Sequence, residues 1–149
     1  MKKILSIILI VCIAGNAHAQ TTVDSVKTVI SNLFSAMKTS NSTLLKSVFT
    51  DSAILQTINT KTGQAVVKTD PVAGFVESIG QLPAGDADEQ ITFDVIKIDG
   101  DLAVAWVPYK FYYKGKFSHC GVNSFQLVRL NKEWKIQYII DTRRRNNCE

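Results

Sequence analysis

The fold is decided by residues 91–142, which read ITFDVIKIDGDLAVAWVPYKFYYKGKFSHCGVNSFQLVRLNKEWKIQYIIDT. Runs rich in β-branched and aromatic residues alternate there with short polar dipeptides, as in strands joined by tight turns. The predicted strands are Ile91–Ile98, Leu102–Tyr113, Phe117–Leu130 and Trp134–Thr142, and the predicted turns are Asp99-Gly100, Lys114-Gly115 and Asn131-Lys132. Because such dipeptides close two-residue hairpins, this stretch predicts a long antiparallel meander.

The residues before the meander predict three helices. Apolar residues at helical spacing predict an amphipathic helix from about Asp24 to Lys38. Asn41 or Ser42 then caps a short second helix, and two short strands follow at 53–58 and 65–67. Asp70-Pro71 predicts a third helix, with the Asp70 carboxylate as its cap and Pro71 at its first position. Helices followed by a meander predict an α+β fold.

The amino terminus has the three parts of a secretory signal peptide. Lys2 and Lys3 precede an apolar run from Ile4 to Gly15, and the small-residue triplet Ala17-His18-Ala19 follows it. The run is too short to span a bilayer, which needs about 20 residues. We therefore expect cleavage after Ala19, a periplasmic or secreted protein, and a single domain over residues 20–149; the alternative is a helix that belongs to the fold.

The charge and the cysteine content limit the function classes. The chain carries 17 basic and 13 acidic residues, and its basic cluster Arg143–Arg145 has no accompanying aromatic stripe, which argues against nucleic-acid binding. The cluster is typical of a solvated tail, or of a rim that meets an anionic ligand. Cys120 and Cys148 either bridge, tying the tail to the sheet, or stay free. One histidine, His119, remains after cleavage, so no metal site is expected.

The turns also predict which side chains share a face of the sheet, because register fixes the alternation. Taken as two-residue loops, they place Val95 opposite Val104, Tyr112 opposite Phe117 and Leu127 opposite Ile136. The predicted inner face is Phe93, Val95, Val104, Trp106, Tyr112, Phe117, His119, Asn123, Phe125, Leu127, Trp134, Ile136, Tyr138 and Ile140. The predicted outer face is Asp94, Ala103, Ala105, Val107, Tyr109, Cys120, Val122, Ser124, Gln126, Gln137, Ile139 and Asp141. The outer face is small and half-apolar, which suits a homodimer through the sheet.

Several stretches resemble a known superfamily. Residues 44–53 (LLKSVFTDSA), Asp70-Pro71 and residues 131–136 (NKEWKI) resemble the nuclear transport factor 2-like superfamily; residues 99–106 and 117–125 are most similar to its putative lumazine-binding branch. The resemblance implies helices packed on a strongly curved, mainly antiparallel sheet, a cone with an internal pocket, and frequent dimers. The superfamily includes isomerases, cyclases, dehydratases, epoxide hydrolases and binding modules, so the resemblance does not identify the reaction or the ligand.

Three functions remain open at this stage. The first is an exported binding module for a small apolar or flat heteroaromatic molecule, held by Phe93, Trp106, Tyr112, His119, Asn123, Phe125 and Tyr138. The second is a cofactor-free isomerase, dehydratase or cyclase, with His119 as general base and Tyr112 or Tyr138 as donor. The enzymatic relatives use a carboxylate as base, and no carboxylate is expected to face inward here, which argues against this second function. The third is a structural domain whose cavity is filled by its own side chains. A single bulge would reverse the faces on which these assignments rest.

Overall fold

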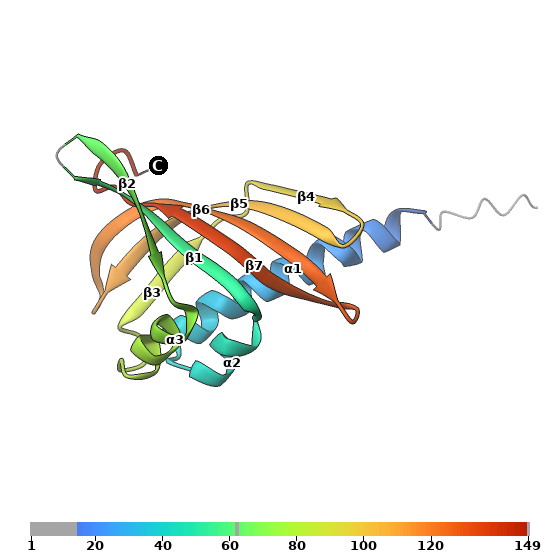
Figure 1. The fold of residues 1–149 in the computed structure, drawn as a ribbon, viewed down its shortest axis with the longest axis horizontal. Helices are drawn as coiled ribbons and strands as arrows, with labels where there is room; N and C mark the ends of the chain where they lie inside the picture. The colour runs from blue at the N-terminus through green and yellow to red at the C-terminus, as the bar shows by residue number, and fades with distance from the viewer. Residues whose placement is uncertain (1–14, 62, 149) are drawn as a thin grey trace, which may run out of the picture.

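The computed structural model describes residues 15–61 and 63–148, which form three helices and seven strands (Figure 1). In chain order these are α1 (Gly15–Lys38), α2 (Ser42–Ser47), β1 (Phe49–Lys61), β2 (Gln64–Asp70), α3 (Val72–Gly80), β3 (Ala87–Ile91), β4 (Val95–Asp99), β5 (Leu102–Tyr113), β6 (Lys116–Leu130) and β7 (Glu133–Thr142). Most of the predicted signal peptide, residues 1–14, lies outside the described residues. Within the described residues, no helix is long and apolar enough to cross a membrane.

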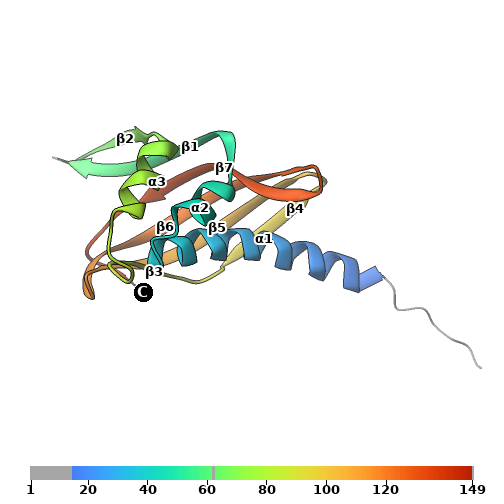
Figure 2. The same cartoon turned by 90° about the horizontal axis from the view of Figure 1, so that it is seen from below.

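The strands form one curved, open sheet in the order β2-β1-β7-β6-β5-β3, and β4 pairs with the part of β5 that β3 leaves free. The pairs are antiparallel except β1 with β7, which run parallel. Figures 1 and 2 show α1 running along one face of this sheet, with α2 and α3 beside it. The predicted α+β class is confirmed.

The core lies between α1 and the inner face of the sheet. The apolar stripe predicted for the first helix is buried, and Phe34 meets Phe125 edge to face with ring centroids 6.2 Å apart. Phe125, Leu127 and Ile136 on the sheet are fully buried. Asn41 caps α2 as predicted, since its side-chain oxygen accepts a hydrogen bond from the Leu44 amide.

The predicted cap of the third helix is wrong. Asp70 belongs to β2, and its carboxylate pairs with Lys68 at 2.7 Å. Because β2 ends at Asp70 and α3 begins at Val72, the cap position of α3 falls on Pro71. Its backbone is extended, and no side chain donates or accepts a capping hydrogen bond there.

Three irregularities change the predicted register of the meander. The strand predicted over 91–98 is split: Ile91 opposes Tyr109 but Val95 opposes Trp106, so one residue of register is gained between them. Further bulges lie between Phe111 and Tyr112, where β5 meets β6, and between Gln126 and Leu127, where β6 meets β7. The first hairpin also closes with Asp99 opposite Leu102, so Gly100-Asp101 forms its loop.

Each bulge shifts the alternation of side chains by one, and several face assignments are therefore wrong. Seven residues were placed inside by the sequence but lie on the outer face: Val95, Val104, Trp106, Tyr112, Phe117, Tyr138 and Ile140. Placed outside but found on the inner face are Ala103, Ala105, Val107, Tyr109, Ile139 and Asp141. Trp106, 47% exposed, and Asp141, 7% exposed, have exchanged the environments predicted for them.

A disulfide ties the carboxyl-terminal tail to the sheet. Cys120 bonds to Cys148 across 28 residues, and two backbone hydrogen bonds of 2.8 Å join Cys120 to Arg144. Closing a loop of this length stabilises the fold by about 3–4 kcal/mol in the chain-entropy account. The tail is therefore fixed beside β6 immediately after Arg143.

Candidate functional site

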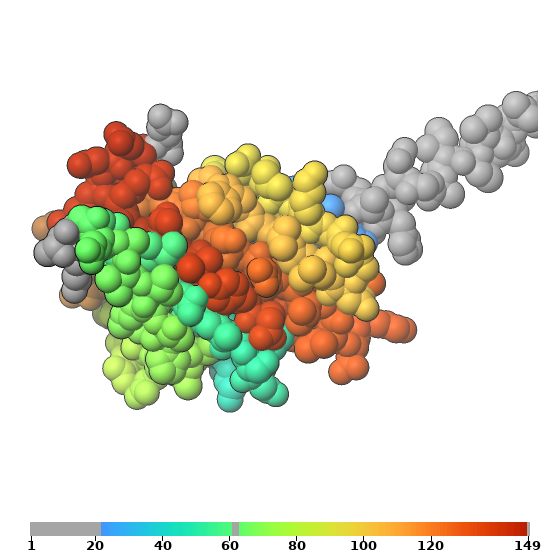
Figure 3. All heavy atoms as spheres, turned by 45° about the horizontal axis from the view of Figure 1, so that its top comes forward, coloured from blue at the N-terminus to red at the C-terminus, as the bar shows by residue number. Residues whose placement is uncertain are grey.

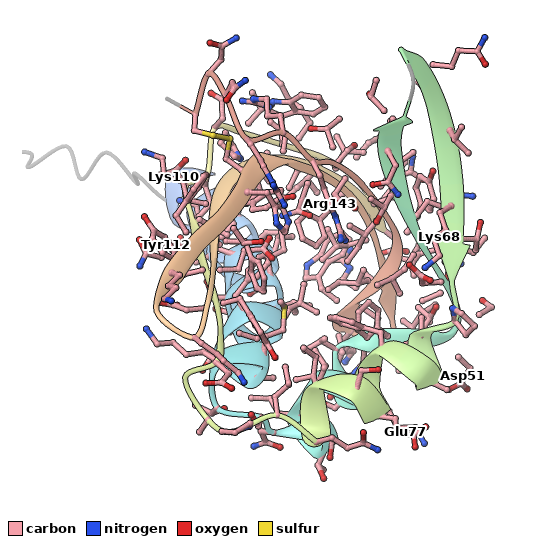
Figure 4. All side chains as sticks on the ribbon, turned by 90° about the vertical axis from the view of Figure 1, so that its left-hand side faces the viewer. Asp51, Lys68, Glu77, Lys110, Tyr112 and Arg143 are labelled. Atoms are coloured by element: carbon pink, nitrogen blue, oxygen red, sulfur yellow. A yellow bond between two sulfur atoms is a disulfide. The ribbon has the colours of Figure 1, made fainter. Side chains whose placement is uncertain are left out.

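A cavity of about 540 Å³ opens between the inner face of the sheet and helices α1 and α3 (Figure 4). Its lining is Leu33, Phe34, Met37, Leu55, Gln56, Thr57, Asp70, Pro71, Gly74, Phe75, Ser78, Ile79, Glu89, Tyr109, Phe111, His119, Asn123, Ile139, Asp141 and Arg143. The helices contribute mainly apolar side chains, whereas the sheet contributes most of the polar ones. The volume falls within the range of small-molecule sites.

The polar wall is built around Asp141, whose inward direction follows from the bulge between β6 and β7. Its Oδ1 accepts a hydrogen bond of 2.6 Å from Thr57, and its Oδ2 accepts one of 2.8 Å from Arg143 Nε. Arg143 Nη2 also donates to Thr57 Oγ1 at 3.0 Å. Asp141 is thus buried, hydrogen-bonded on both oxygens and paired with a positive charge, so it serves to join β1 and β7 rather than to contact a ligand.

Tyr109 reaches this cluster from β5 across the intervening strand. Its hydroxyl lies 2.9 Å from the Thr142 carbonyl oxygen and 3.2 Å from Asp141 Oδ2, so its proton can go to either. The ring crosses β6 at Gly121, where a Cβ would overlap the Thr142 carbonyl oxygen and lie 2.9 Å from the Tyr109 ring. Burial, followed by the charge of Asp141, raises the pKa of Tyr109, and the phenol therefore stays protonated.

Glu89 lies on β3 at the other side of the polar wall. Its Oε1 accepts a hydrogen bond of 2.8 Å from Asn123 Nδ2, and no cation among the described residues pairs with it. Burial raises the pKa of Glu89 to about 7. The Asn123 hydrogen bond lowers this pKa, the charge of Asp141 raises it further, and the charge of Arg143 lowers it by a smaller amount. A cavity carboxyl with this pKa can accept or release a proton near neutral pH.

His119 lies in the same row of the sheet as Glu89, since Phe111 opposes both of them from β5. The imidazole packs on Phe111 and Tyr109, with centroids 5.1 and 5.7 Å away, and Nδ1 lies 3.0 Å from Ser118 Oγ. Burial, and then the charge of Arg143, lowers the pKa of His119. It is therefore neutral at neutral pH, and no carboxylate of the described residues orients it.

Two of the seven residues predicted to bind a ligand, His119 and Asn123, line the cavity. Phe125 is buried in the core, and Trp106 lies on the outer face. The other three are not part of the lining: Tyr138 donates to Oε1 of Gln56, a lining residue, at 2.6 Å, Tyr112 packs on Phe117 at 5.9 Å, and Lys27 Nζ lies 5.7 Å from the Phe93 ring. Of the predicted catalytic residues, Tyr112 and Tyr138 therefore do not line the cavity that contains His119.

The prediction that no carboxylate faces inward is wrong, because Glu89 and Asp141 both do. Glu89 was missed because it lies before Ile91, where the first strand of the meander was predicted to begin. Asp141 was assigned to the wrong face because a bulge between β6 and β7 turns its side chain inward. The sequence held one signal, Gly121: a glycine inside a strand marks a bulge or a close approach of another chain segment. Among the described residues, no group of three or more His, Cys, Asp or Glu is placed to hold a metal ion.

Solved structures share this architecture. An NTF2-like protein of unknown function from Shewanella baltica matches with a TM-score of 0.68 at 15% identity, covering 84% of this chain and 95% of that one. A domain with a cystatin-like fold from Nostoc punctiforme gives 0.66 at 13% identity, with coverages of 85% and 80%. A putative dehydratase of the NTF2-like family from Streptomyces avermitilis gives 0.63 at 15% identity, with coverages of 85% and 98%. At these identities the likeness shows the fold, an NTF2-like cone.

The sequence also matches a family described as "Putative lumazine-binding" over residues 21–138. The match spans most of the chain and includes Glu89, His119 and Asn123, but it ends before Asp141 and Arg143. No curated protein matches the chain.

Proposed function

Since the chain belongs to the putative lumazine-binding family, we propose that it binds a small, largely apolar molecule in the cavity between the sheet and helices α1 and α3. The observation that carries this proposal is the open volume of about 540 Å³ with an apolar wall facing a polar one. Phe34, Phe75 and Phe111 give the cavity aromatic surfaces. A flat heteroaromatic ligand, as the family's name suggests, would have rings to stack on and polar groups for its edge.

The test is native mass spectrometry of the mature protein from its original host, followed by release and identification of any bound molecule. Gly74 on α3 lines the cavity and has open space where a Cβ would stand, so Gly74→Trp should fill the cavity and abolish binding. Ala73→Trp, on the same helix but outside the lining, is the matched control. If the Gly74→Trp variant still retained the ligand, the ligand would have to bind outside this cavity, and the proposal would be wrong.

A second function, acid–base catalysis, is favoured by one specific observation, the pKa of Glu89 near 7 in an otherwise largely apolar cavity. Glu89 rather than His119 is then the general base, because its second oxygen faces the cavity and the imidazole has no orienting carboxylate. Given any activity, Glu89→Gln should lower kcat about 10²–10⁴-fold, and His119→Ala should lower it far less. The reverse order would restore His119 as base.

The third function, a structural domain with a filled cavity, is supported least. Phe125 and Trp106 would have filled it, but they lie in the core and on the outer face, and the cavity between the helices and the sheet is open.

The domain over residues 20–149 is exported in this proposal, as a periplasmic or secreted protein cleaved after Ala19. The Cys120–Cys148 disulfide supports export, because such bonds persist in oxidising compartments. Amino-terminal sequencing of the secreted protein tests it: Gln20 is expected as the first residue, and an intact Met1 would contradict it.

The outer sheet face is proposed to form a homodimer. Figure 3 shows a surface formed by strands β4 to β7 that α1 does not cover. On it Val95, Val104 and Trp106 are 41, 38 and 47% exposed. Trp106→Lys should give a monomer by light scattering, whereas Leu130→Lys, equally exposed but at the β6–β7 turn, should not.

A further inference from the structure

Two of the carboxylates that line the cavity form ion pairs, and the third, Glu89, does not. Asp141 is paired with Arg143 at 2.8 Å, and Asp70, at the rim, is paired with Lys68 at 2.7 Å. Among the described residues, the Glu89 carboxylate has one hydrogen-bond partner, the neutral amide of Asn123, and no ion pair. Within the part of the chain that the structure describes, Glu89 is thus the cavity charge without a counter-charge.

Neighbouring groups do not supply that counter-charge. Lys38, at the end of α1, pairs with Asp88, the residue before Glu89, at 3.1 Å and does not line the cavity. Arg143 donates its hydrogen bonds to Asp141 and Thr57, and its charge offsets that of Glu89 only in part, as the smallest of the four effects on the Glu89 pKa. Arg145 lies on the exposed tail, where solvent screens its charge.

The Glu89 carboxylate is also open toward the cavity. Asn123 occupies Oε1, and none of the described residues donates a hydrogen bond to Oε2. Asn123 is itself buried, 7% exposed, and its amide fixes the carboxylate from one side. The opposite wall, from α1 and α3, presents Leu33, Phe34 and Phe75. This arrangement is an anionic acceptor facing an apolar chamber.

We propose that Glu89 and Asn123 form a subsite for a positively charged nitrogen group, such as an amidinium, on a ligand whose apolar body lies against α1 and α3. This inference rests on the proposed binding function and names the chemical class that the same cavity selects. A nitrogen cation donating to Oε2 forms a charge-assisted hydrogen bond, and it neutralises a carboxylate that burial otherwise penalises. An anionic head group would meet Glu89 and Asp141 without a free cation.

The preference also depends on pH. The other titratable groups that line the cavity are Tyr109 from β5, His119 from β6, Asp141 from β7, Arg143 just after β7, and Asp70 from β2. Tyr109 stays protonated and His119 stays neutral near neutral pH, and the other two acids are paired. Because the pKa of Glu89 is about 7, the affinity for a permanent cation should rise as the pH rises through 7.

A matched series of three probes tests the inference: 2-naphthamidine, 2-naphthamide and 2-naphthoate share one ring system and differ in head-group charge. Calorimetric titration at about pH 8 should rank the cation above the amide and the amide above the anion, with at least ~10-fold between the cation and the anion. Glu89→Gln should lower the amidine affinity at least ~10-fold and leave the amide nearly unchanged. Asp88→Asn, the same change one residue away and outside the lining, should preserve the order.

The outcomes separate the two proposals. If none of the three probes binds, the proposed binding function fails with the subsite. If they bind equally, or the naphthoate binds best, the cavity binds small molecules and the cation subsite is wrong. An amidine affinity unchanged by Glu89→Gln would also overturn it, and if that variant does not fold, the ranking on the natural chain decides.

Discussion

Glu89 and Asp141, two of the three carboxylates that line the cavity, occupy different surroundings. Asp141 accepts hydrogen bonds on both oxygens and pairs with Arg143, whereas Glu89 has one neutral partner and an oxygen open to the cavity. A buried charge that is fully paired is part of the framework. One that is left unpaired stores a free-energy cost that a ligand or a proton can relieve. We therefore assign Asp141 to the stability of the fold and Glu89 to ligand binding.

The largest expected effect on stability comes from substituting Asp141, the fully paired carboxylate. Asp141→Asn removes the charge that Arg143 and Thr57 share, and should lower the free energy of unfolding by about 3 kcal/mol. The figure is at the low end for a buried pair because the Arg143 side chain is 48% exposed. Urea denaturation measures it, with Glu89→Gln as the matched control. If Glu89→Gln destabilised the fold more, the assigned roles would be exchanged.

The pH dependence of stability tests whether the pKa of Glu89 is raised in the folded protein. The folded pKa of Glu89 is about 7, raised from the ordinary 4.5, so the folded state holds its proton more tightly than the unfolded chain. The stabilisation is complete below about pH 4.5 and is lost as pH rises through 7, up to about 3 kcal/mol in all. Unfolding free energies of the natural chain and Glu89→Gln should diverge over this interval. A constant difference would mean that Glu89 ionises as it does in water.

A smaller effect is expected where Tyr109 crosses β6 to reach Asp141. Gly121→Ala places a methyl group against the Thr142 carbonyl and the Tyr109 ring, and should cost about 2 kcal/mol. Gly74→Ala, on the opposite wall, meets nothing within 4 Å and should stabilise α3 by about 0.5–1 kcal/mol. Thermal unfolding of the two variants should show a lower Tm for Gly121→Ala and a higher Tm for Gly74→Ala. Equal changes in Tm would mean that Tyr109 and the Thr142 carbonyl do not pack closely on Gly121.

The smallest effect belongs to the Tyr109 hydroxyl itself. Tyr109→Phe keeps the ring over Gly121 and removes one donor to the Thr142 carbonyl and Asp141, and should cost about 1 kcal/mol. Probe affinities should not change, because this hydroxyl is used within the framework. A large loss of affinity in calorimetry, with stability intact, would make Tyr109 a ligand contact.

The sequence predicted the elements well and the site poorly, for a physical reason. At the second and third turns the predicted register is confirmed, since Tyr112 opposes Phe117 and Leu127 opposes Ile136. At the first turn it is wrong, because the hairpin closes with Asp99 opposite Leu102. Asp141 lies beyond a bulge, which shifts every later side chain by one and leaves no mark in the hydrophobic pattern.

An irregularity in the sheet also explains why Glu89 was not predicted. The structure has two strands, β3 (Ala87–Ile91) and β4 (Val95–Asp99), separated by residues 92–94, whereas the sequence predicts one strand that begins at Ile91 and leaves Glu89 out. The pairing of Cys120 with Cys148 also depended on a distance between strand and tail that composition cannot supply; their Cα atoms lie 5.8 Å apart.

Titration of the Glu89 carboxyl carbon by NMR, assigned by comparison with Glu89→Gln, measures whether this carboxyl is the unpaired acid of the cavity. We expect a midpoint near pH 7 in the free protein, and a lower midpoint when 2-naphthamidine is added, because the cation stabilises the ionised form. A midpoint near the ordinary 4.5 that the amidine leaves unchanged would contradict this expectation, and would show a solvated carboxylate with no special relation to the cavity.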